Sequence, residues 1–163
     1  MKRLNFIIIP AFTVFVAVLG STITSAGMEW YKTINLPSFT PPGSVIGMVW
    51  TVIFILSTAS ALIYWNIHKP WGKVPRGSSF LVTIALFILN GLLNVAWSLL
   101  FFGQHNMIAA FFEAIVLDLT VIGLIILIWP RSKWASILLL PYALWTAFAS
   151  FLTWNIYQLN LPN

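Results

Sequence analysis

Five long apolar segments dominate this sequence, and they cover residues 6–26, 44–65, 80–102, 107–128 and 134–157. Each contains 21 to 24 residues, enough for an α-helix to cross a hydrocarbon core about 30 Å thick. Strands of a membrane barrel would instead alternate apolar and polar residues over about 10 positions. Because lipid offers no partner for backbone polar groups, each segment must satisfy its own hydrogen bonds as a helix. The sequence therefore predicts an all-α membrane protein, a bundle of five transmembrane helices.

The composition excludes an ordinary water-soluble domain. Of the 163 residues, 60% are hydrophobic and 7% are charged, whereas a soluble domain carries about 25% charged residues. The five segments account for most of the chain, so we expect a single domain over residues 1–163. The chain contains no cysteine, which excludes disulfides, thiolate metal sites and a cysteine nucleophile.

The first segment has two interpretations. Lys2 and Arg3 form a basic start, and the sequence Thr24-Ser25-Ala26 resembles a cleavage site, as in a secretory signal peptide. The alternative is a membrane span. We favour the span because the apolar stretch is long enough to cross the bilayer.

Basic residues are distributed unequally between the two ends of the predicted bundle. Seven of the eight precede the first segment or lie in the second and fourth connections: Lys2, Arg3, Lys69, Lys73, Arg76, Arg131 and Lys133. The eighth, Lys32, lies in the first connection. The positive-inside rule then predicts a cytoplasmic N-terminus and a C-terminus outside. The net charge of +5 sits at the ends of spans, where it suits lipid headgroups, and we expect no nucleic-acid partner.

The first connection, residues 27–43, combines aromatic residues with prolines. Its aromatic and large apolar residues are Trp30, Tyr31, Leu36 and Phe39, and its prolines are Pro37, Pro41 and Pro42. Proline fixes its own backbone and restricts the preceding residue, so we expect a pre-shaped loop. Two roles fit this composition. One is an interfacial aromatic belt with a rigid turn, and the other is a lid over the mouth of the bundle.

Polar and aromatic residues recur at helical spacing in three segments. In the third segment the stripe consists of Asn90, Asn94, Trp97 and Phe101. Comparable stripes are Trp50, Phe54 and Ser57 in the second segment, and Tyr142, Trp145, Ala149 and Leu152 in the fifth. Residues at this spacing share one face of a helix. Amides on such a face require protein or a cavity opposite them, so the stripes predict either helix–helix packing or the lining of a pocket.

Two acidic residues, Glu113 and Asp118, lie inside the fourth segment. An ionisable residue within a span is a functional candidate by default. A spacing of five residues places them about 140° apart around a helix, which excludes a paired acid–base site. We expect structural hydrogen bonds for both, and a proton relay or a transport role is the alternative.

Other chemical motifs are weak or missing. His68 and His105 belong to connections on opposite sides of the membrane, so they cannot share a metal ion. The sequence has no glycine-rich phosphate loop, nucleophile elbow or zinc signature. We therefore expect no metal site and no conventional catalytic constellation.

Several blocks of the sequence together resemble the TspO/MBR family, the tryptophan-rich sensory proteins and translocator proteins. The matching blocks are Trp30-Tyr31, Leu36-Pro37-Ser38-Phe39-Thr40-Pro41-Pro42, Trp50, Leu93-Asn94-Val95-Ala96-Trp97, Phe101-Phe102-Gly103, Leu140-Pro141-Tyr142, Trp145 and Ala147-Phe148-Ala149. The resemblance implies a five-helix bundle, usually a homodimer, with a ligand pocket beneath the first loop and no required cofactor. Family ligands are porphyrins, isoquinoline carboxamides and, in animals, cholesterol.

The resemblance implies an integral membrane receptor or sensor for porphyrin in a bacterial cell membrane. Its alternatives are transport of porphyrin or other lipophilic ligands, and light-dependent porphyrin breakdown with photochemical roles for Trp50 and Trp145. The expected ligand-binding residues are Trp30, Tyr31, Trp50, Phe54, Asn90, Asn94, Trp97, Tyr142, Trp145, Ala149 and Leu152. Animal members end their sterol pattern with Arg after the last span. Here Gln158 follows Tyr157 and no basic residue comes after it, which disfavours a sterol ligand.

Overall fold

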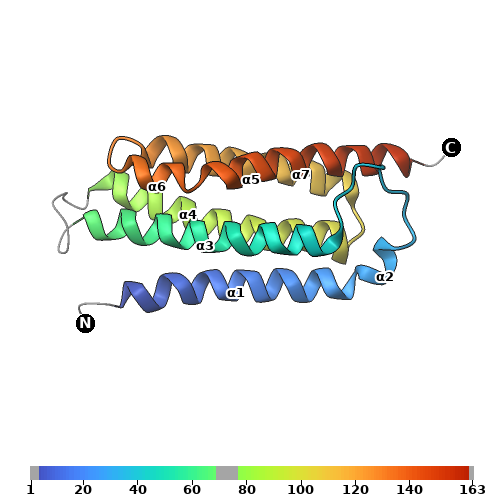
Figure 1. Ribbon diagram of the computed structural model, residues 1–163, viewed down its shortest axis with the longest axis horizontal. Helices are drawn as coiled ribbons and strands as arrows, with labels where there is room; N and C mark the ends of the chain where they lie inside the picture. Colours follow the sequence, from blue (N-terminus) through green and yellow to red (C-terminus); the bar gives the residue numbers. More distant parts are fainter. Residues whose placement is uncertain (1–3, 69–76, 162–163) are drawn as a thin grey trace.

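The computed structural model describes residues 4–68 and 77–161, and these form a bundle of long helices (Figure 1). The helices are α1 (Asn5–Ala26), α2 (Met28–Tyr31), α3 (Gly43–Ile67), α4 (Ser78–Ser98), the π-helix η1 (Leu99–Gly103), α5 (Met107–Ile128), α6 (Lys133–Ile137) and α7 (Leu140–Leu159). Within these residues, five helical segments of 22 to 27 residues are long and apolar enough to cross a membrane. The predicted all-α bundle of five spans is confirmed.

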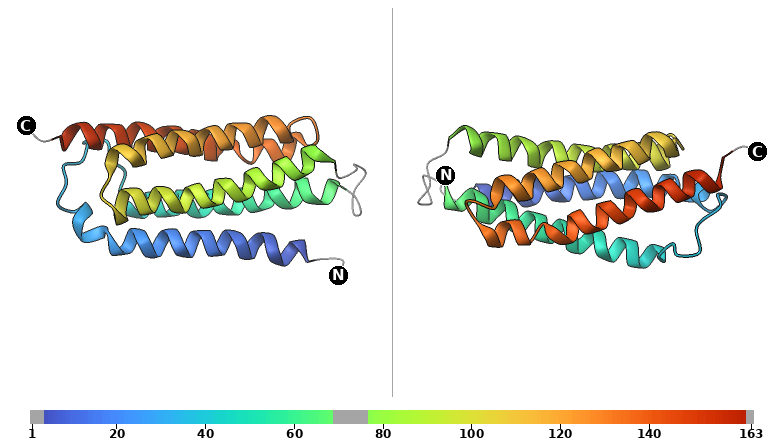
Figure 2. Two further views of the ribbon diagram at one scale, coloured as in Figure 1. Left: turned by 180° about the vertical axis from the view of Figure 1, so that it is seen from behind. Right: turned by 90° about the horizontal axis from the view of Figure 1, so that it is seen from above.

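The spans run side by side along the long axis of the molecule, and the start of α1 and the end of α7 lie at opposite ends of the bundle (Figures 1 and 2). Helix α5 packs against α7 and α4, while α1 packs against α4 and α3. Helices α3 and α7 contact each other only sparsely. This loose pairing leaves space inside the bundle.

Two spans are less regular than the sequence predicts. Pro141 lacks the N–H that a continuous helix over 134–157 would need, and the chain turns at Leu138 and Leu139 between α6 and α7. The third span ends in the π-helix η1, where the Gln104 N–H donates to the Leu99 carbonyl at 2.8 Å. A π-turn of this kind is frequent at functional sites.

The interior is packed tightly at one end of the bundle and is rich in aromatic rings at the other. The tight cluster includes Tyr64, Phe80, Val121, Leu124, Ile128 and Leu139. At the other end, Phe101, Phe102, Ala110, Leu152 and Ile156 are buried together. Large apolar side chains elsewhere are exposed, among them Leu144 at 74% and Leu81 at 68%. Such an apolar exterior is expected where helices face lipid.

Candidate ligand-binding cavity

A cavity of about 990 Å³ lies inside the bundle, between the tightly packed end and the loop that follows α1. We call it the ligand cavity. All five spans and the loop contribute to its walls. Its volume falls at the upper end of the range of about 300–1,000 Å³ that is common for small-molecule sites.

The loop leaves α1 at Gly27, which packs directly against the π-turn. A Cβ atom at Gly27 would lie 2.4 Å from the carbonyl oxygen of Phe102. Only a residue without a side chain fits there unless the backbone moves. This close approach brings α2, with Trp30 and Tyr31, against the aromatic residues of η1.

Aromatic rings hold α2 in place. Trp30 meets Phe101 edge-on at 5.5 Å between ring centroids, and Tyr31 lies 5.6 Å from Phe102. Phe101 also stacks on Trp97 at 5.1 Å. Offset and edge-on pairs of this type are worth about 0.5–1.5 kcal/mol each beyond their burial. The loop is therefore a lid packed on the bundle, the second of the two roles that its composition allows.

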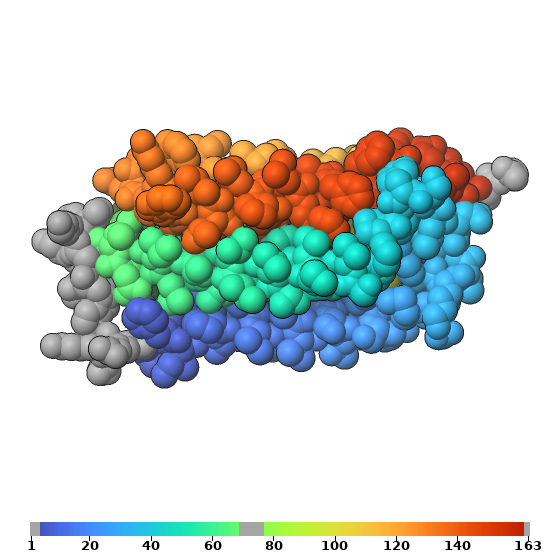
Figure 3. Space-filling view, viewed as in Figure 1, coloured from blue at the N-terminus to red at the C-terminus, as the bar shows by residue number. Residues whose placement is uncertain are grey.

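The far side of the lid is fastened to the end of α7. The Asn35 N–H donates to Asn160 Oδ1 at 2.9 Å, and Asn160 Nδ2 donates back to the Asn35 carbonyl at 2.9 Å. Phe39 stacks on Phe151 at 5.6 Å. In the space-filling view the lid, coloured light blue to cyan, covers the end of the bundle from α1 across to α7 (Figure 3).

Eight of the eleven predicted ligand-binding residues line the ligand cavity: Tyr31, Trp50, Phe54, Asn94, Trp97, Trp145, Ala149 and Leu152. Trp30 lies outside this lining and stacks on His105 at 4.1 Å. Asn90 and Tyr142 instead line a second, smaller cavity. Asn90 donates to Thr120 at 2.8 Å, a bond between α4 and α5, so it acts as helix–helix packing.

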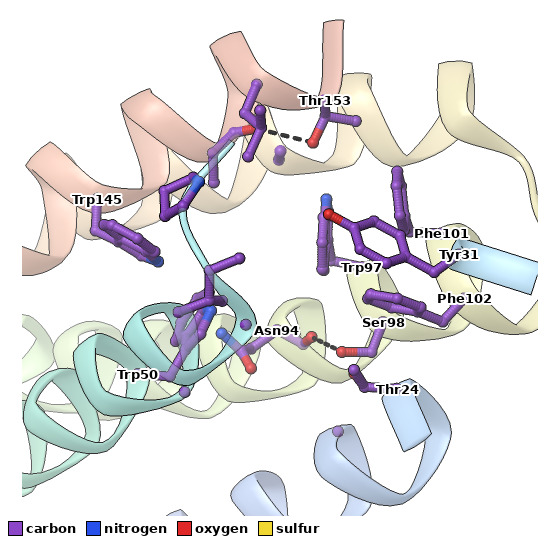
Figure 4. Close-up of a pocket in the computed structure, with 18 of the residues that line it drawn as sticks. Thr24, Tyr31, Trp50, Asn94, Trp97, Ser98, Phe101, Phe102, Trp145 and Thr153 are labelled. Carbon is purple, nitrogen blue, oxygen red and sulfur yellow. Dashed lines mark hydrogen bonds between the residues drawn. The ribbon is translucent and has the colours of Figure 1, made fainter. Parts of the chain in front are cut away.

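Two hydrogen-bond donors in the wall of the ligand cavity lack a partner in the described part of the chain. Trp97 Nε1 and Trp145 Nε1 are buried and have no hydrogen-bond partner among the described residues. Burial raises the pKa of Tyr31 above its usual value, so its hydroxyl stays protonated at neutral pH. Figure 4 shows Trp145 with Trp50 on one side of the cavity and Trp97 with Tyr31 on the other. Because buried polar groups are normally paired, the two indole N–H groups are candidates for contact with a ligand.

Charge is almost absent from these walls. Of the described residues that line the cavity, Lys32 alone is charged, and its ammonium pairs with exposed Glu29 at 2.6 Å. The acids of α5 lie outside the lining. Asp118 accepts a hydrogen bond from Thr146 at 2.6 Å, as expected. Glu113 is buried, but neither carboxyl oxygen has a partner within the described residues, so the expected structural hydrogen bond is not formed there.

The sequence matches the TspO/MBR family over residues 6–159. This chain belongs to the TspO/MBR family. Similar relatives include the tryptophan-rich protein TspO of Bacillus cereus, 36% identical over 98% of this chain and 99% of the relative. The tryptophan-rich sensory protein of Cereibacter sphaeroides is 26% identical over 91% and 90%. The human translocator protein is 26% identical over 98% and 90%. Membership of the TspO/MBR family and the five apolar spans make this chain an integral, multi-pass membrane protein.

One wall of the cavity in this TspO/MBR protein was not predicted from the sequence. Small residues of α1 line it, namely Ala17, Gly20, Ser21 and Thr24. Their spacing of i, i+3, i+4 and i+7 is that of one helix face. Small residues let another group approach a helix closely. Their stripe in the first span could therefore have predicted that this helix face lines the cavity.

Proposed function

We propose that this TspO/MBR protein is a receptor or sensor that binds a porphyrin-type tetrapyrrole in the ligand cavity beneath the lid. The observation that carries the proposal is a cavity of about 990 Å³ whose wall includes two unpartnered indole N–H groups. A flat apolar macrocycle suits aromatic walls. Its carboxylate or carbonyl substituents accept hydrogen bonds, which matches donors such as Trp97 and Trp145. Two relatives carry the names tryptophan-rich sensory protein and translocator protein. Both names are consistent with a protein that responds to a ligand.

Titration of protoporphyrin IX into the purified protein tests the proposal. We expect a saturable shift of the porphyrin absorption band, with one porphyrin bound per chain. An isoquinoline carboxamide should compete for the same cavity. A porphyrin absorption band in protein purified from its native membrane would support the same conclusion. A band shift that depends on the detergent concentration and is the same without the protein would contradict it.

A second activity, light-dependent porphyrin breakdown, is favoured by the position of two indoles. Trp50 and Trp145 both line the ligand cavity, next to the proposed position of the porphyrin. In this version the bound porphyrin is the photosensitiser and oxygen is the oxidant, so the protein supplies orientation and oxidisable indoles. Illumination of the complex with a dark control separates the two activities, since binding alone leaves the product spectrum unchanged by the protein.

We further propose a cytoplasmic N-terminus in a bacterial cell membrane. Arg131 and Lys133 lie at the end of the bundle where α1 begins (Figure 1). The other five basic residues used for the orientation, Lys2, Arg3, Lys69, Lys73 and Arg76, lie outside the described residues. The positive-inside rule supports this orientation. The family resemblance further suggests that the chain forms a homodimer.

A further inference from the structure

A second cavity of about 210 Å³ adjoins the ligand cavity, bounded by α1, α3, α4 and Tyr142 of α7. We call it the inner cavity. Along α1 it is lined from Ile8 to Val16, whereas the ligand cavity is lined from Val16 to Thr24. The inner cavity therefore lies farther from the lid, deeper in the membrane part of the bundle.

Three side chains line both cavities: Val16, Phe54 and Asn94. Val16 and Phe54 are apolar and Asn94 is uncharged, so among the described residues no charged side chain is shared by the two linings. Asn94 is held by a long hydrogen bond, in which its Nδ2 donates to Tyr142 Oη at 3.3 Å. These three side chains form the boundary between the two cavities, so a group bound in the ligand cavity would enter the inner cavity by displacing them.

Most hydrogen-bonding groups in the wall of the inner cavity are already engaged. Thr13 Oγ1 accepts from Thr58 at 2.9 Å and donates to the Ile9 carbonyl at 3.2 Å. Asn90 and Asn94 have their own partners, described above. Ser57 Oγ is buried without a partner among the described residues. Because its polar groups are used, the inner cavity presents a mainly apolar surface to whatever enters it.

We propose that the inner cavity is a subsite for one short apolar substituent, of ethyl or vinyl size, on the ligand that occupies the ligand cavity. This inference rests on the proposed function, and it specifies one substituent that the ligand should carry. An apolar cavity of about 150 Å³ accepts benzene or xenon. A space of about 210 Å³ takes a short alkyl group and excludes a second macrocycle.

A lipid acyl chain offers the same chemistry from another source. Ile8 and Ile88 line the inner cavity and are also 54% and 46% exposed, so hydrocarbon from the bilayer lies close by. We assign the subsite to the ligand because three side chains are shared with the ligand cavity. The test below separates the two sources.

The test compares two porphyrins that differ only in short alkyl groups. Mesoporphyrin IX carries ethyl groups where deuteroporphyrin IX carries hydrogens. We expect mesoporphyrin IX to bind the unaltered protein about tenfold more tightly, the gain from burying roughly two hydrocarbon carbons. Ser57→Leu places an isobutyl group in part of the inner cavity and removes a hydroxyl that has no partner among the described residues, so the preference should fall towards equal affinities. Ala85→Leu adds the same side chain at an exposed position of α4 that lines neither cavity, and it should keep the preference.

Xenon supplies a readout that needs no variant. The methyl signals of Ala61, which lines the inner cavity only, should shift with xenon in the free protein and in the deuteroporphyrin complex. Bound mesoporphyrin IX should abolish that shift. Equal affinities for the two porphyrins, or xenon shifts that persist with mesoporphyrin IX, would overturn the assignment. A phospholipid that co-purifies with the unaltered protein and is lost in Ser57→Leu would assign the subsite to lipid instead. If neither porphyrin binds, the proposed function itself fails.

Discussion

Asn35 in the lid and Asn160 at the end of α7 exchange two hydrogen bonds, each 2.9 Å long, across 125 positions of sequence. The Asn160 amide both accepts from the backbone of Asn35 and donates to it. A third bond, from Asn35 Nδ2 to the Leu159 carbonyl at 3.4 Å, lies beside this pair. The lid is thus tied at both of its ends, to the π-turn by aromatic packing and to α7 by amide bonds.

Replacing Asn160 should loosen the lid without unfolding the bundle. Asn160→Leu removes two bonds to Asn35, each worth about 0.5–1.5 kcal/mol. We expect dissociation of bound porphyrin to accelerate by up to about tenfold, measured by stopped-flow absorbance. Asn155→Leu is the matched control, because Asn155 lies on the same helix and, among the residues that the structure describes, its side chain bonds only to the Phe151 carbonyl of that helix. Equal dissociation rates for the two variants would show that the hydrogen bonds between Asn35 and Asn160 do not slow the release of the ligand.

A side chain at Gly27 should destabilise the lid and the π-turn together. The added Cβ of Gly27→Ala would lie 2.4 Å from the Phe102 carbonyl oxygen, and such overpacking costs about 1–3 kcal/mol. We expect a lower melting temperature in detergent. In Gly47→Ala the added atom meets nothing within 4 Å, and the helix gains from the better propensity of alanine. A Gly27→Ala protein that melts no earlier than Gly47→Ala would show that the close approach is not required.

Trp145 separates binding from photochemistry. Trp145→Ala should cost about 1–3 kcal/mol of porphyrin affinity, as for the loss of an aromatic anchor, while Trp145→Phe should retain much of it. If the indole takes part in light-dependent breakdown, Trp145→Phe should also slow product formation under illumination. Breakdown that proceeds at the parent rate in Trp145→Phe would remove this residue from any chemical role.

The orientation of the chain is open to a direct assay. Because seven of the eight basic residues are predicted on one side, a reporter fused after Asn163 should be active only outside the cytoplasm. Alkaline phosphatase activity in intact cells measures this. A fusion protein that is present in the membrane but has no phosphatase activity would invert the topology and place the lid on the cytoplasmic side.

The spans and much of the cavity wall were predictable because the bilayer imposes strong local rules. Only helices satisfy the backbone in lipid, and residues at helical spacing, such as Trp145 and Ala149, necessarily share a face. Which neighbour that face meets depends on how the helices pack. The periodicity that grouped Asn90 with Asn94 therefore could not show that Asn90 bonds to Thr120 and lines the inner cavity.

Other features depend on contacts between distant parts of the chain. Gly27 must be glycine because of the position of Phe102, about 75 residues later. The hydrogen bonds between Asn35 and Asn160 likewise join segments that are far apart in the sequence. The aromatic content of the loop does not distinguish Tyr31, which lines the ligand cavity, from Trp30, which packs on Phe101 and His105 outside its lining. The π-turn at η1 had no local signal in the sequence.

A ligand site beneath the lid is tested most directly by the affinity of protoporphyrin IX for Ala149→Leu, measured together with thermal melting in detergent. Ala149 lines the ligand cavity, so the larger side chain should enter that space, leave melting near the parent value and lower affinity at least tenfold, about 1.4 kcal/mol. Ala147→Leu, on the exposed face of α7, should change neither quantity. A variant that melts early while its folded fraction binds porphyrin with parent affinity would contradict a ligand site beside Ala149.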